Sequence, residues 1–118
     1  MSQLTPYFSR QEFACKCGCG FDTVDTATLD VLEQVRRHFA MPVTITSGCR
    51  CPSYNAQVGG APQSQHLVAR AADIQVQNVD PEAVASYVED NFHTASIGRY
   101  ATFTHIDTRT NGPARWED

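Results

Sequence analysis

The strongest structural signal in the sequence is a helical pattern that stops abruptly and gives way to a strand pattern. Between residues 25 and 40 the apolar side chains recur at helical spacing, at Leu29, Leu32, Val35 and Phe39. Met41-Pro42 ends this helix, because proline cannot extend it, and residues 43–47 are rich in the β-branched side chains that favour strands. In a chain of 118 residues, this combination leaves room for one modest core. We therefore expect a single domain over residues 1–118.

Shorter patterns of both kinds fill the rest of the chain. Residues 71–77 alternate as a strand would, and two further strands are expected near residues 97–100 and 103–108. A short helix is predicted from about residue 51 to 58, and a longer one opens at Asp80-Pro81, an N-cap followed by proline at the first helical position. Helices separated by strands that can pair as hairpins predict an α+β fold. We expect a small, mainly antiparallel sheet with helices packed on it.

The sequence also carries side chains that could hold a metal ion. Residues 64–73 read SQHLVARAAD, and residues 104–107 read THID. His66, Asp73 and His105 supply two imidazoles and a carboxylate, which can fill three of the four tetrahedral positions of a zinc ion. The fourth position would hold a water that the metal makes acidic enough to attack a carbonyl. The residue types alone are compatible with a zinc site in a cleft on the sheet and with hydrolytic chemistry, although most histidines and aspartates of a chain are solvated or structural.

Asp107 stands next to this group if residues 103–108 form a strand. Positions two apart on a strand face the same side, so His105 and Asp107 should both face the cleft while Ile106 faces the core. From there Asp107 could orient the imidazole of a ligand or take the proton from a zinc-bound water, and the sequence leaves both catalytic roles open. Glu89 and His93 are the remaining candidates for a base, without a sequence reason to lie near the metal.

Together with residues 47–55, which read SGCRCPSYN, these segments resemble the M15 family of zinc D-Ala-D-Ala carboxypeptidases and related peptidoglycan endopeptidases. The closest likeness is to the short, single-domain members found in bacteriophages and prophages. The resemblance runs from about Phe8 to Trp116. Its motif is Ser-x-His, then Ala-x-Asp, and later the second ligand His, and the matching residues are Ser64, His66, Ala71, Asp73 and His105.

The resemblance also implies roles for residues outside the ligand set. Arg50 would hold a carboxylate of the peptide substrate and position it for catalysis, although a structural salt bridge is the other reading of this side chain. Ser64 would lie close to the scissile bond. Tyr54 belongs to the same motif as Arg50 and would help to bind substrate, or it would only shape the loop. Trp116 is expected to pack over the sheet edge, although an exposed indole could also stack on a sugar.

Two departures from the family pattern bear on the site. Ala69 stands where glycine is usual, and alanine would strain the loop between the ligands if that backbone needs a positive φ. Many family members also place Glu three residues before the last ligand His, or His two residues before it. This chain has Thr102 and Phe103 there, and neither side chain can act as a base.

The combined reading is zinc-dependent hydrolysis of an amide bond in the peptide stem of bacterial peptidoglycan, by a lytic endopeptidase of a phage or prophage. The same ligands would serve a D-Ala-D-Ala carboxypeptidase. A third alternative is a catalytically silent zinc-binding module of a wall or virion, which the lack of an acid before His105 favours.

Composition and charge limit the other partners. A net charge of -4 does not indicate the basic surface that nucleic-acid binding requires. No apolar stretch of the sequence is long enough to span a bilayer. The N-terminal residues 1–8 lack the basic and apolar regions of a secretory signal. We expect a monomer whose partner is the peptidoglycan stem peptide, made in the cytoplasm and reaching the cell wall by another route, with neither nucleic-acid binding nor membrane insertion.

The five cysteines form two clusters with Cys-x-Cys spacing. An odd number of cysteines in a chain without a signal argues against a disulfide framework. Four thiolates could instead hold a second, structural zinc ion with one cysteine to spare. Reduced thiols without a ligand role are the alternative. The cysteines concerned are Cys15, Cys17, Cys19, Cys49 and Cys51.

Overall fold

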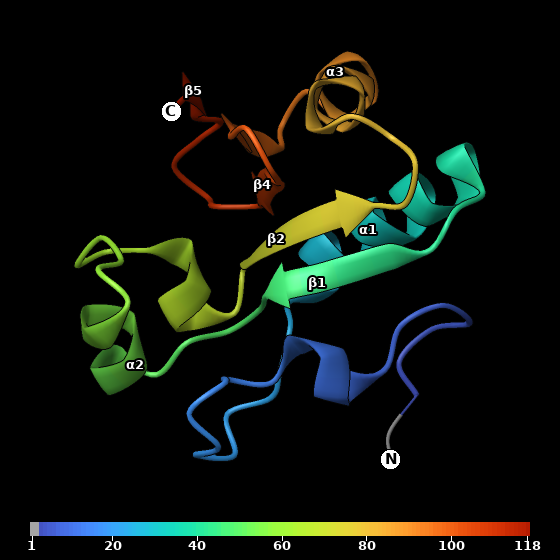
Figure 1. Ribbon diagram of the computed structural model, residues 1–118. Helices are drawn as coiled ribbons and strands as arrows, with labels where there is room; N and C mark the ends of the chain where they lie inside the picture. Colours follow the sequence, from blue (N-terminus) through green and yellow to red (C-terminus); the bar gives the residue numbers. More distant parts are fainter. Residues whose placement is uncertain (1–2) are drawn as a thin grey trace.

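The computed structural model describes residues 3–118, so the first two residues of the segment inspected for a signal lie outside it. Its elements follow one another as shown in Figure 1. In chain order they are η1 (Arg10–Phe13), α1 (Thr26–Phe39), β1 (Val43–Ser47), α2 (Pro52–Gln57), η2 (Gln65–Val68), β2 (Ala71–Val76), α3 (Pro81–Asn91), β3 (Ser96–Arg99), β4 (Thr104–Asp107) and β5 (Arg115–Glu117).

The strands form one sheet in the order β1-β2-β4-β3-β5. The pairs β1–β2, β2–β4 and β3–β4 are antiparallel, and β5 runs parallel to its neighbour β3. The predicted α+β fold with a mainly antiparallel sheet is confirmed. Among the described residues, no helix has the length and apolar character that a membrane crossing requires.

The two longer helices pack together against one face of the sheet. α1 contacts β2 and α3, and α3 contacts β2, β3 and β4. Strand alternation supplies the sheet side of the core, with Ile74, Ile97 and Ile106 almost completely buried. In Figure 1, α1 lies behind β1 and β2, and η2 and α2 lie beyond the end where β2 begins.

The opposite face of the sheet carries a row of residues aligned across neighbouring strands. Asp73 on β2 pairs with His105 on β4, His105 pairs with Gly98 on β3, and Gly98 pairs with Trp116 on β5. Since side chains alternate along a strand, burying Ile74 and Ile106 against the helices turns Asp73 and His105 to this other face. The hydrophobic core thereby fixes which polar side chains meet.

The end of α1 shows a backbone that its sequence does not favour. The helix begins after Asp25, whose side chain accepts a hydrogen bond from the backbone N of Ala27 at 3.1 Å. It ends at the exposed Ala40, which adopts the left-handed conformation with φ 55° and ψ 32°. Glycine is the usual residue at such a helix end, because a Cβ makes this conformation costly.

Replacing Ala40 by glycine should therefore stabilise the protein. We expect Ala40→Gly to raise the free energy of unfolding by about 0.5–1 kcal/mol, since relief of backbone strain exceeds the added entropy of the unfolded chain. Ala27→Gly, at an exposed helical position of the same helix, should lower it by about 0.5–1 kcal/mol. Urea denaturation measures both. Equal signs for the two changes would contradict this account.

Candidate metal centre

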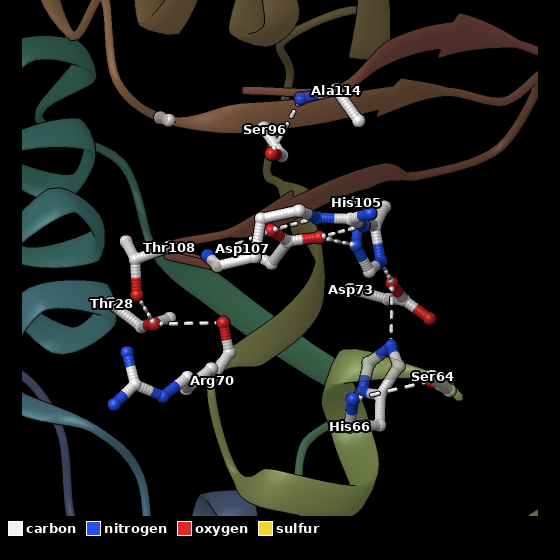
Figure 2. A network of polar contacts seen from close by, with 12 residues as sticks. Thr28, Ser64, His66, Arg70, Asp73, Ser96, His105, Asp107, Thr108 and Ala114 are labelled. Carbon is white, nitrogen blue, oxygen red and sulfur yellow. Dashed lines mark hydrogen bonds and ion pairs between the residues drawn. The ribbon is translucent and has the colours of Figure 1, made fainter. Parts of the chain in front are cut away.

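Three side chains from separate elements converge on the polar face of the sheet. Asp73 comes from β2, His105 from β4, and His66 from η2, the turn that precedes β2. One donor atom of each lies within 4.8 Å of the others, and all three side chains are buried. Figure 2 shows the two imidazoles on either side of the Asp73 carboxylate. The predicted ligand residues are thus brought together.

The Asp73 carboxylate is the hub of this group. Its Oδ1 atom lies 2.8 Å from His105 Nδ1 and 3.3 Å from His66 Nε2. Its other oxygen, Oδ2, lies 3.6 Å from Arg50 Nη2. Burial alone would raise the pKa of Asp73, but the hydrogen bonds and charges of the two histidines hold it well below its usual range. Asp73 is therefore ionised.

Each imidazole is also held from its outer side. His66 Nδ1 lies 2.6 Å from the carbonyl oxygen of Gly48, which can only accept, so Nδ1 carries a proton and donates it. In neutral His66 the lone pair is then on Nε2, facing Asp73. Ser64 caps η2 and accepts a hydrogen bond from the backbone N of His66 at 3.2 Å.

His105 is held in the same manner from the far side of its ring. Its Nε2 lies 2.8 Å from Asp107 Oδ2. Asp107 is fully buried and accepts from Arg109 Nε at 3.0 Å and Arg109 Nη2 at 2.7 Å. Burial would raise the pKa of Asp107, but Arg109 and His105 lower it well below its usual range. The strand alternation predicted for His105 and Asp107 is confirmed by the paired register with β2.

These contacts require positive charge at the centre. With both outer nitrogens donating, neutral imidazoles would present two lone pairs to one ionised oxygen of Asp73, an arrangement that repels. Protonation is one remedy: burial would lower the pKa of His105, but Asp107 and Asp73 outweigh it and raise that pKa. A cation bound by His66 Nε2, Asp73 Oδ1 and His105 Nδ1 is the other. Two imidazoles fixed by acceptors on their outer nitrogens, with a carboxylate, are the donor set of zinc hydrolases.

Arg50 sits at the rim of this group and is firmly held. Its Nε donates to Ser47 Oγ at 3.2 Å and its Nη1 to Asn55 Oδ1 at 3.1 Å. Asn55 is itself fixed, because its Nδ2 donates to the carbonyl of Ala61 at 3.0 Å. The guanidinium is therefore pre-oriented beside Asp73, with 14% of the side chain exposed. Both readings of Arg50, structural and substrate-binding, are compatible with this position.

A cleft of about 370 Å³ opens over the three candidate ligands. Trp116 forms one wall, its ring centroid 5.0 Å from that of His105, and its Nε1 donates to Tyr100 OH at 3.0 Å. The indole lies against Gly98, where an added Cβ would meet it at 2.6 Å. Trp116 thus packs over the sheet, as expected, and also lines the cleft. Other lining residues include Arg50, Ser64, Gln65, Phe103 and Arg109.

Other residues named from the sequence lie away from the cleft. Tyr54 is on α2, where its backbone N donates to Cys51 Sγ, and it is not among the described residues that line the cleft. Glu89 pairs with Arg99 at 2.6 Å, and His93 is exposed beyond the end of α3. The role predicted for Tyr54 stays a prediction, and neither Glu89 nor His93 lines the cleft.

The sequence reading missed the supports of the site. The carbonyl of Gly48 carries no side-chain signature, and nothing in the sequence of residues 47–55 indicates that Asn55 holds Arg50. Arg109 could have been paired with Asp107 from their spacing on a strand end, two residues apart. Ala69, between His66 and Asp73, adopts a positive φ of 60°. The loop between the ligands therefore has the conformation that glycine would adopt without strain.

Comparison with known proteins identifies the family of this chain. Searches of curated proteins and of solved structures returned no match. A family model described as Peptidase M15 matches residues 6–107, a span that includes all three candidate ligands and Arg50. This match covers most of the chain and confirms the resemblance seen in the sequence. The chain therefore belongs to the Peptidase M15 family.

Proposed function

We propose that this protein is a zinc peptidase that cleaves an amide bond in the peptide stem of bacterial peptidoglycan. Membership of the M15 family indicates a zinc-dependent metallopeptidase. The observation that carries the proposal is the convergence of His66 Nε2 and His105 Nδ1 on Asp73 Oδ1, with the other nitrogen of each ring already held by an acceptor. A site built in this way is prepared for a cation before the cation arrives.

Zinc held by these three residues would polarise the scissile carbonyl and acidify a water. The chain contributes the orientation of its ligands. Gly48 fixes the ring of His66 and Asp107 fixes the ring of His105, so neither imidazole has to reorganise on binding. The three candidate ligands are buried, so their side chains are restricted to the positions in which they face one another.

Of the two roles open to Asp107, the contacts favour orientation. The imidazole of His105 separates the Asp107 carboxylate from the nitrogen that faces Asp73. Both Asp107 oxygens accept hydrogen bonds from Arg109, and the side chain has no exposed surface. A base has to reach the proton that it removes, and Asp107 is on the far side of a ligand ring.

Arg50 is the best candidate to bind the substrate. Ser47 and Asn55 aim its guanidinium at the cleft, and Arg109 adds a second cation to the cleft wall. Stem peptides carry free carboxylates, which a guanidinium binds with matched geometry. Ser64, at the start of η2 and on the cleft wall, is placed to contact the peptide near the scissile bond.

We extend the proposal to a lytic endopeptidase of phage or prophage type, acting on the wall after release by another route. A D-Ala-D-Ala carboxypeptidase would use the same ligands and remains the second candidate. A silent zinc-binding module is the third. It is favoured by one observation, that Asp73 is the only carboxylate among the described residues that line the cleft.

Incubation with purified peptidoglycan separates these functions. New amino termini within the stem, found by labelling and mass spectrometry, would support an endopeptidase, whereas release of free D-alanine would support a carboxypeptidase. A chelator should abolish either activity and zinc should restore it. No product from zinc-loaded protein would overturn the peptidase proposal and leave the binding module.

The metal ligands can be tested apart from activity. His66→Ala should remove one equivalent of zinc while circular dichroism shows the fold retained, because the variant deletes one of three protein ligands. The measurement is best made with Cys19→Ser also present, which excludes thiolate-bound metal from the count. His93→Ala, an exposed histidine outside the cleft, is the control. Full zinc content in the His66 variant would refute this ligand assignment.

Asp107→Asn distinguishes orientation from base catalysis. If Asp107 orients His105, the change should weaken zinc binding by about 10- to 100-fold, and saturating zinc should restore most of the hydrolysis. If Asp107 is the base, turnover stays low at any zinc concentration. Competition with a chromogenic chelator gives the affinity, and Asp90→Asn on the exposed side of α3 is the control. Unchanged zinc affinity would contradict the orienting role.

A further inference from the structure

Four cysteine thiols form a second group of possible metal ligands, in which Cys15 is buried and Cys17 and Cys19 are exposed. The sulfur atoms of Cys15, Cys17, Cys19 and Cys51 all lie within 4.8 Å of one another. The sulfur atoms are 3.5 Å apart in Cys15–Cys17, 3.8 Å apart in Cys15–Cys51 and 3.6 Å apart in Cys17–Cys51. All four cysteines are free, so none of these pairs is a disulfide.

The separations match a tetrahedral metal site. Zinc–thiolate bonds of about 2.3 Å in tetrahedral geometry place the sulfurs roughly 3.8 Å apart. A disulfide would need about 2.05 Å between two sulfurs and would leave the other two thiols unexplained. Three pairs of sulfurs 3.5–3.8 Å apart, with the fourth sulfur within 4.8 Å of each, therefore fit one central ion better than two bonded pairs.

The backbone around the cluster is shaped to converge the thiols. An extended Cys-x-Cys-x-Cys segment would spread its sulfurs along one side. Instead, Gly18 and Gly20 adopt φ values of 81° and 95°, which only glycine adopts readily, and the chain turns after each of them. The backbone N of Gly18 donates to the carbonyl of Cys15 at 3.2 Å, closing the turn that brings Cys17 back over Cys15.

Backbone N–H groups also point at the sulfurs, as expected for thiolates. The N of Cys51 donates to Cys15 Sγ at 3.4 Å, and the N of Tyr54 donates to Cys51 Sγ at 3.4 Å. Hydrogen bonds from backbone N–H groups favour the thiolate, which is the form of cysteine that binds zinc.

The fifth cysteine is separated from the cluster by its hydrogen bonds. Cys49 is buried, and its Sγ lies 3.1 Å from the carbonyl oxygens of both Phe13 and Phe21, which share its single S–H donor. A thiol that donates is protonated, whereas zinc binds the thiolate. Cys49 is therefore the spare cysteine that the sequence could not single out.

We propose that Cys15, Cys17, Cys19 and Cys51 bind a structural zinc ion. The ion joins the N-terminal segment to the loop between β1 and α2. That loop presents the Gly48 carbonyl to His66 and the Arg50 guanidinium to Asp73. Gly48 also lies so close to Phe13 that an added Cβ would meet its carbonyl oxygen, so the two segments are already pressed together beside the cluster. The ion would hold the supports of the peptidase site in place.

The test counts zinc in the full chain with the peptidase site disabled. His66→Ala should retain one equivalent of zinc, and a mercurial reagent that titrates thiols should release it. Adding Cys17→Ser should abolish that equivalent, whereas adding Cys49→Ser should keep it, because the single proton of a hydroxyl can replace that of the thiol beside these carbonyls. Substitution by cobalt should give the intense thiolate-to-metal absorption of a sulfur site in the Cys49 variant and none in the Cys17 variant.

Several outcomes would overturn the proposal. The first two are a His66→Ala protein that contains no zinc and a His66→Ala/Cys17→Ser protein that still contains one equivalent of zinc. The others are loss of that zinc on adding Cys49→Ser, and iron bound in place of zinc. None of these depends on hydrolysis. A protein that keeps the thiol-bound zinc but cleaves no peptidoglycan would contradict the proposed function and leave this inference standing.

Discussion

The arrangement of the site depends on one buried carboxylate placed between two imidazoles. Asp73 Oδ1 faces a nitrogen of His66 and a nitrogen of His105, and each ring is held from behind by an acceptor. Buried charge is costly unless it is compensated, so this group is stable only with protons or a cation at its centre. The polar face of the sheet is therefore organised around a positive charge, which protonated imidazoles or a bound cation would supply.

Hydrophobic burial decides which side chains form that group. The isoleucines of β2, β3 and β4 face α1 and α3, and strict alternation along the strands turns Asp73 and His105 to the other side in register. A shift of one residue would place both in the core. The ligand from outside the sheet, His66, is positioned by a short turn whose own supports are Ser64 and the Gly48 carbonyl. The packing of the hydrophobic core thus also determines where Asp73 and His105 lie in the site.

Much of the fold followed from local signals. The long helix with its Met41-Pro42 stop, the branched strand after it and the Asp80-Pro81 helix start were predicted within one or two residues, because each has a distinct period or cap. Strand β5 and its parallel pairing with β3 were not predicted, since three residues carry no period and the contact of Trp116 with Gly98 that accompanies the pairing is tertiary. The ligands could be named from residue type and resemblance. Backbone contacts such as His66 with Gly48, and the separation of Cys49 from the other thiols, are set by tertiary packing and leave no pattern in the sequence.

Anomalous diffraction from a crystal of the zinc-loaded protein, recorded on both sides of the zinc absorption edge, tests the central claim most directly. The account predicts a peak on the polar face of the sheet, roughly 2.0–2.2 Å from His66 Nε2, His105 Nδ1 and an oxygen of Asp73. Asp107 should remain bonded to His105 Nε2 on the opposite side of the ring. A zinc-saturated crystal with no peak there, or with the ion on the Asp107 side of His105, would contradict it.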